Sequence, residues 1–162
     1  MNKVMFLQAL KKFTADAVKD LMLPVSVQSE KDDGALRPAA VHLMHLPDSK
    51  SFSKKAPYII HQLISGSDSQ NEGQAEESRV TVRSIFCVYC GDDEVGGLQL
   101  LNLMERLRIA LLRKRIIGEQ YVLDLQTPME CLCYPDDTAP YFAGEMVSVW
   151  KLPAVRQEVS FL

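Results

Sequence analysis

The sequence contains no long uninterrupted apolar run. A membrane-spanning helix needs about 18 or more consecutive apolar residues, and no stretch of the 162 residues approaches that length. The N-terminal segment is interrupted by Gln8, Lys11 and Lys12, and no small-residue cleavage site follows it, so it lacks the pattern of a secretory signal. We therefore expect no membrane association, and we expect the four cysteines in a reduced, cytosolic setting.

An excess of basic residues is also lacking. The chain has 18 Lys and Arg against 21 Asp and Glu, which gives a formal net charge of -3. Proteins that bind nucleic acid broadly usually present a basic surface, so we expect no specific nucleic-acid binding. Hydrophobic residues make up 47% of the chain and charged residues 24%, which is typical of a soluble globular domain of this length.

Known catalytic motifs are missing as well. There is no Gly-x-Gly-x-x-Gly, P-loop, Gly-x-Ser-x-Gly or His-Glu-x-x-His pattern. Gly96 and Gly97 open a helix-like segment, but three acids precede them where phosphate oxygens would bind. His42, His45 and His61 fall on strand-like segments, and we interpret them as core or surface residues. We predict no catalytic residues, no cofactor and no enzymatic activity.

Hydrophobic periodicity predicts two helices. Apolar residues recur with helical spacing over residues 2–22 and 96–115. In the second segment the apolar surface is so wide that we expect the helix to be largely buried, against a sheet and a neighbouring subunit. Basic residues at 113–115 suit the C-terminal end of a helix dipole, and Gly118 is the expected C-terminal breaker.

Strand-like runs fill much of the remaining chain, at residues 24–30, 39–47, 57–65, 79–90, 121–126, 129–135 and 144–153. Residues 66–78 contain no large apolar side chain, so we predict a mobile surface loop at the tip of a long β-hairpin. This order predicts an α+β fold: a mainly antiparallel β-sheet packed by two helices. We assign residues 1–152 to a single domain and residues 153–162 to a C-terminal arm.

Cys87 and Cys90 have the Cys-x-x-Cys-Gly spacing of half a zinc ribbon. The other pair, Cys131 and Cys133, is spaced Cys-x-Cys on a strand-like run, where the two side chains are separated by about 6.6 Å. That is too far apart for tetrahedral zinc, and the odd offset sends Cys87 and Cys90 to opposite faces of a strand. We interpret all four as buried, unreactive thiols and expect no metal; a metal site or a disulfide is the alternative.

Acidic residues gather before the second helix and in a later turn. Asp92, Asp93 and Glu94 precede the helix, and Asp136 and Asp137 lie in the "YPDDTAP" segment. Together they could bind magnesium, as in a nuclease. Acids at a helix N-terminus also cap free N–H groups and complement the dipole, and Asp-Asp-Thr-Ala-Pro is typical of a turn. We favour capping and turn formation.

The second half of the chain carries a series of motifs in a recognisable order. A strand ending in an acidic stretch is followed by an "LLNLMERLR" helix at Leu100–Arg108 and an Ile-x-Gly turn at Ile117–Gly118. A "YPDDTAPYFAGEM" segment at Tyr134–Met146 and a Trp-x-Leu-Pro end at Trp150–Pro153 complete the series. Over residues 79–155 this arrangement resembles the tail terminator, or tail-completion, proteins of tailed phages and prophages of Gram-positive bacteria.

The resemblance implies a structural role in virion assembly. Such proteins form a ring, usually of six subunits, on the finished tail tube; the ring stops tube polymerisation and presents a surface to the head connector. The implied partners are further copies of the chain, the tail tube protein, head–tail connector proteins and, in contractile tails, the sheath. DNA passes through the ring without specific recognition. The implied location is the tail or neck of the virion, after assembly in the cytoplasm of the bacterial host.

Three alternatives remain beside this interpretation: a head-completion or neck connector protein, a metal-dependent phage nuclease that uses the acidic cluster, and a small zinc-binding regulator. Family members often carry acidic or small residues where this chain has Cys87 and Cys90, so shared cysteine chemistry is not implied.

We expect contacts with partners at four places: the 31–37 loop, the 66–78 loop, the C-terminal arm and the acidic corner, which is formed by Asp92, Asp93 and Glu94. The candidate contact residues are Asp92, Asp93, Glu94, Arg106, Arg156, Phe161 and Leu162. The arm interleaves apolar and charged residues, which favours docking on a partner; a disordered end is the alternative.

Overall fold

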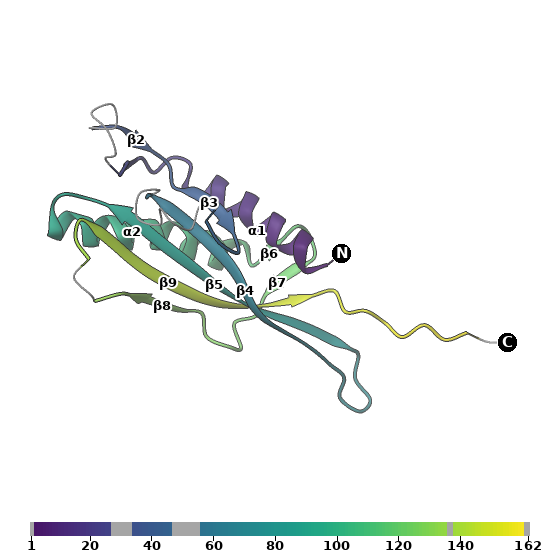
Figure 1. Ribbon diagram of the computed structural model, residues 1–162. Helices are drawn as coiled ribbons and strands as arrows, with labels where there is room; N and C mark the ends of the chain where they lie inside the picture. The colour runs from purple at the N-terminus through teal and green to yellow at the C-terminus, as the bar shows by residue number, and fades with distance from the viewer. Residues whose placement is uncertain (1, 27–33, 47–55, 136–137, 161–162) are drawn as a thin grey trace.

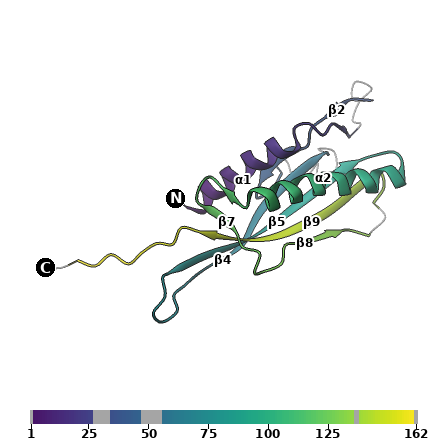
Figure 2. The ribbon, with the colours of Figure 1, turned by 180° about the vertical axis from the view of Figure 1, so that it is seen from behind.

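The computed structural model describes residues 2–26, 34–46, 56–135 and 138–160. Two helices and a mainly antiparallel, curled sheet make up this part of the chain, so the predicted α+β class is confirmed. Both helices lie on the same face of the sheet and contact each other (Figure 1, Figure 2). The main hydrophobic core fills the space between this helical layer and the sheet.

Helix α1 (Lys3–Val18) begins at Asn2, whose side-chain oxygen accepts a hydrogen bond of 2.9 Å from the backbone N–H of Met5. It ends four residues before the predicted boundary at residue 22. The helical spacing in the sequence predicts an apolar face of Val4, Leu7, Leu10, Ala17 and Leu21. This prediction is partly wrong, because Val4 is 61% exposed. The face that packs on the sheet is offset from the predicted one and consists of Phe6, Leu7, Leu10, Thr14 and Val18.

The seven-stranded sheet has the order β3-β4-β5-β9-β7-β6, with β8 paired to β9. Its strands are β3 (Ala40–Leu43), β4 (Tyr58–Ser69), β5 (Glu77–Tyr89), β6 (Ile116–Ile117), β7 (Tyr121–Leu123), β8 (Glu130–Cys133) and β9 (Tyr141–Leu152). All pairs are antiparallel except β3 with β4. Proline cannot donate a ladder hydrogen bond, so the sequence predicts that Pro153 ends the last strand. Strand β9 stops directly before it.

A separate two-stranded pair joins β1 (Leu23–Pro24) to β2 (Leu36–Arg37). The strand predicted at 24–30 is present only at its start within the described residues, and residues 27–33 lie outside them. The expected 31–37 loop is therefore described only from residue 34, and its last two residues belong to β2 rather than to a loop.

Strands β4 and β5 pair from Tyr58 opposite Cys87 to Ser69 opposite Glu77. The predicted 66–78 loop is too long, because residues 66–69 and 77–78 are strand and only residues 70–76 connect them. A β-ladder is held by backbone hydrogen bonds, so it can continue past the core where the side chains are polar. Ile64 interrupts the register between β4 and β5 as a bulge, a feature that bends and twists a strand pair. The pair projects beyond the body of the molecule in both views (Figure 1, Figure 2).

Helix α2 (Asp93–Lys114) begins three residues earlier than predicted, so Gly96 and Gly97 lie inside it and do not open it. Gly96 has a packing role instead: a Cβ there would collide with the ring of Phe142 on β9. The helix ends at Arg115, which adopts a φ of 60° and donates its backbone N–H to Leu111. Gly118, the predicted breaker, lies in the turn between β6 and β7 with a φ of 56°.

Candidate interaction surfaces

The acidic corner at the start of α2 is a helix cap. Asp92 accepts a hydrogen bond of 3.0 Å from the backbone N–H of Val95, and Asp93 and Glu94 occupy the first helical turn. Their negative charges complement the positive end of the helix dipole. The predicted capping role is confirmed. All three side chains are exposed, so their carboxylates also remain accessible to another molecule.

An apolar stripe runs along the outer side of the first half of α2. Val95, Leu98 and Leu101 are 44%, 62% and 46% exposed, while Leu100 and Leu103 on the inner side are buried. The sheet therefore covers only part of the wide apolar surface that the sequence shows. Single exposed apolar residues are common on protein surfaces, but these three are neighbours on one helix and form a continuous patch. Such patches are typical of contact surfaces.

The thiols divide into two pairs, so the interpretation of all four as buried is wrong for one pair. Cys87 and Cys90 are buried, whereas Cys131 and Cys133 on β8 are exposed. Strand β8 pairs only with β9 among the described residues, so it lies at an edge where little covers its side chains. Burial raises the pKa of Cys87 to about 11, and burial likewise raises the pKa of Tyr58, its neighbour on β4.

Thiol labelling should separate the two pairs. In native protein near neutral pH we expect a maleimide to modify Cys131 and Cys133, while Cys87 stays unmodified because it is buried and almost entirely protonated. Cys90 should be protected by burial alone. Mass spectrometry after labelling should show two adducts in native protein and four after unfolding in guanidinium. Four adducts in native protein would contradict the placement of Cys87 and Cys90.

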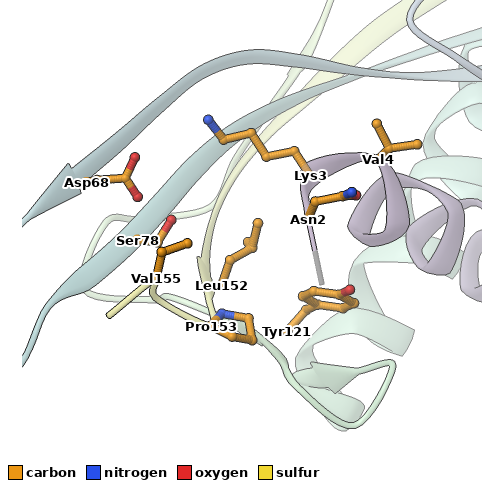
Figure 3. A pocket seen from close by; sticks show the side chains of 9 residues that line it. All are labelled: Asn2, Lys3, Val4, Asp68, Ser78, Tyr121, Leu152, Pro153 and Val155. Atoms are coloured by element: carbon orange, nitrogen blue, oxygen red, sulfur yellow. The ribbon is translucent and has the colours of Figure 1, made fainter. Parts of the chain in front are cut away.

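The C-terminal arm leaves the body at Pro153, and residues 153–160 form neither helix nor strand. The arm points away from the sheet in both views (Figure 1, Figure 2). At its base a hollow of about 390 Å³ opens between the start of α1 and the stem of the β4–β5 hairpin. Figure 3 shows Lys3, Asp68, Tyr121 and Val155 around this hollow. Val155 is 87% exposed and Val159 63% exposed, so the described arm leaves apolar side chains uncovered.

His61 is fully buried between α1 and the sheet. Its Nε2 lies 2.8 Å from the hydroxyl of Thr14 and its Nδ1 lies 2.7 Å from the hydroxyl of Ser84. A neutral imidazole has one donor and one acceptor nitrogen, and hydroxyls can take either role, so both contacts are satisfied without a charge. Burial lowers the pKa of His61 to about 3. The expectation of a core histidine is confirmed, and the side chain is inaccessible to a substrate.

Because His61 stays neutral in the folded chain, stability should depend on pH. Between pH 6.5 and about 3 the unfolded chain binds one more proton at this residue than the folded chain does. The neutral, buried His61 therefore contributes to the free energy of unfolding. This contribution is fully present above pH 6.5 and decreases as the pH falls, by about 2 kcal/mol at pH 5. Urea unfolding at pH 7.5, 6 and 5 should show the free energy of unfolding falling more steeply for the wild type than for His61→Gln. Equal slopes would contradict the assignment.

The candidate contact residues do not form one site. Asp92, Asp93 and Glu94 lie at the end of the molecule where α2 begins, and Arg106 is exposed farther along that helix. Arg156 is exposed on the arm at the opposite end (Figure 1). The remaining two, Phe161 and Leu162, lie outside the described residues. The chain therefore offers several separate surfaces. The sequence indicated the exposed stripe of α2 only indirectly, because it showed an apolar helix surface too wide to be covered by the sheet alone.

Within the described residues, no three His, Cys, Asp or Glu side chains converge as metal ligands would. Neither described helix is long and apolar enough to span a membrane. No protein-family model matches the chain, and no curated protein matches its sequence.

Proposed function

We propose that this chain is a structural virion-assembly protein, a phage tail terminator. In this proposal several copies, six in the usual case, form a ring on the end of the tail tube. The ring stops tube polymerisation and offers its other side to the head connector. The first support is the ordered series of motifs over residues 79–155 that resembles this family.

The observation that carries the proposal is the separation of the uncovered surfaces. The hairpin tip at residues 70–76 and the arm at residues 153–160 project from one end of the molecule, and α2 begins at the other end (Figure 1, Figure 2). Val95 and Leu98, in the first turns of α2, are exposed. When two copies join through different surfaces, each copy still has one surface free for the next. Such a contact produces a ring if the rotation closes.

The proposal also gives a role to the projecting strands. We assign the long hairpin of β4 and β5 to gripping a neighbouring subunit or the tube, because its tip stands clear of the sheet and its helices. The hairpin has a firm base for this role, because α1 and α2 pack on the sheet through the main hydrophobic core, to which Val80 and Val82 of β5 also belong.

The structural role accounts for the acidic corner better than a magnesium-dependent nuclease does. The carboxylate of Asp92 is engaged by the backbone of Val95, and Asp93 and Glu94 lie in the same helical turn and complement its dipole. The other acids of the nuclease hypothesis, Asp136 and Asp137, lie outside the described residues. A zinc-binding regulator is disfavoured by the division of the cysteines into a buried pair and an exposed pair.

Deletion of the gene followed by electron microscopy of the particles tests the proposal. Overlong or headless tails are expected if the protein terminates the tube. Tails of normal length that fail to join heads would instead indicate a head-completion or neck connector protein. Normal joined virions would end both proposals. As a second test, a protein that stays strictly monomeric in the presence of tail tubes would count against a terminator ring.

A further inference from the structure

Charge is distributed unevenly along this mildly acidic chain. The segment from residue 62 to 78, which forms the outer hairpin, holds four acids, Asp68, Glu72, Glu76 and Glu77, and no Lys or Arg. The segment from residue 106 to 118, at the end of α2, holds five basic residues and no acid: Arg106, Arg108, Arg113, Lys114 and Arg115. Two oppositely charged surfaces therefore lie on different elements of one molecule.

The basic residues border a groove. A hollow of about 380 Å³ lies between α1 and α2, with Ala17 on the α1 side and Arg106, Ile109 and Arg113 on the α2 side. Arg106 and Arg113 are exposed, and Ile109 is 39% exposed. The one acid that lines the groove, Glu105, lies 2.6 Å from Arg108 and is neutralised by it.

The hairpin tip of one molecule points away from the groove of the same molecule. The helices lie on one face of the sheet. The hairpin leaves the body near the start of α1, and its tip extends outward and does not fold back toward the two helices (Figure 1, Figure 2). The two surfaces are therefore available to different copies of the chain rather than to each other within one copy.

We propose that the acidic hairpin tip of one copy docks in the basic groove between α1 and α2 of a second copy. The tip contains no large apolar residue, so the attraction is mainly between Glu72 or Glu76 and Arg106 or Arg113, with Ile109 as an apolar floor. Complementary charges of this kind fix orientation and exclude wrong partners. The contact joins two different surfaces, so each copy keeps one surface free for the next copy, as a ring requires. The place of this contact in a phage tail rests on the proposed function.

Charge reversal on each side tests the contact. The groove variant is Arg106→Glu/Arg113→Glu and the tip variant is Glu72→Lys/Glu76→Lys. Sedimentation velocity of the wild-type protein should show self-association that weakens with added salt, because exposed charges are screened. Each variant alone should lose about tenfold or more in self-association affinity. An equimolar mixture of the two should recover it, because each reversed surface then meets its complement on the other variant.

Lys11→Glu is the matched control, since Lys11 is an exposed cation of α1 that does not line the groove; it should self-associate as the wild type does. Circular dichroism checks that every variant is folded.

Two results would overturn this contact: a wild-type protein that is monomeric, or charge reversals that do not change self-association. The proposed function would then still be tested by the gene deletion. Duplex DNA is the other ligand that a basic groove could bind. If the groove variant binds duplex DNA more weakly than the wild type does but self-associates equally well, the proposed contact is also overturned. Recovery in the mixture together with normal virions after gene deletion would instead keep the contact and reject the tail terminator.

Discussion

Replacing Trp150 by alanine is expected to lower the free energy of unfolding by about 3–5 kcal/mol. Trp150 is the only tryptophan of the chain and is fully buried on β9. Its ring packs against Phe6 of α1 at a centroid distance of 5.3 Å, and its indole N–H donates to the hydroxyl of Ser148 at 2.9 Å. Alanine would leave a cavity at the contact between helix and sheet, which the surrounding residues refill only in part.

Urea unfolding followed by far-ultraviolet circular dichroism measures this loss, since the variant has no tryptophan fluorescence. A single domain is stable by about 5–15 kcal/mol in total, so the variant should unfold at a much lower urea concentration. Val155→Ala on the arm is the control, because Val155 is 87% exposed and its loss should change stability by less than about 0.5 kcal/mol. A loss below about 1 kcal/mol for Trp150→Ala would contradict the central position of this side chain.

The second large effect is expected at Arg79. Its guanidinium lies 2.8 Å from a carboxylate oxygen of Asp124, whose side chain is only 3% exposed. Arg79→Met would leave that carboxylate buried without a countercharge, which should cost about 3 kcal/mol of unfolding free energy. The exposed partner Glu77, at 3.2 Å from the same guanidinium, should contribute little, because water screens the pair.

A double variant distinguishes the buried charge from simple loss of packing. Asp124→Asn removes the charge but keeps an oxygen that can accept the 3.1 Å hydrogen bond from the backbone N–H of Gln126. Combined with Arg79→Met, it should recover at least half of the lost stability in urea unfolding, since no unpaired charge then remains buried. Glu77→Gln is the control and should match the wild type within about 0.5 kcal/mol. If Arg79→Met also lies within that range, the pair does not stabilise the fold.

Local patterns predicted the class of fold and most of the elements. The apolar period of the two helices, the β-branched run of β5 and the proline after β9 all act through neighbouring residues, so they could be interpreted without knowledge of the fold. The same holds for Asp92, whose cap depends only on the helix that follows it. The role of Gly96 was not accessible in this way: it lies inside α2 and leaves room for the ring of Phe142, a residue 46 positions later in the chain.

The candidate surfaces were less accessible from the sequence. Cys131 and Cys133 look like core residues by type, but their strand lies at an edge of the sheet, and an edge is a property of strand order. The stripe of Val95, Leu98 and Leu101 appeared as part of one wide apolar surface. Which part of that surface the sheet would cover depends on the rotation of α2 about its axis, which packing sets.

The sequence by itself determined the α+β class, the cap of α2, the end of β9 and the opposite charges of the outer hairpin and the end of α2. Each of these follows from residues close together in the chain. Only the tertiary structure decided that residues 66–69 continue a strand, that His61 lies between Thr14 and Ser84, and that the acidic tip points away from the basic groove. These features depend on which distant segments pack together, and pairing across the sheet brings together residues that no local pattern relates.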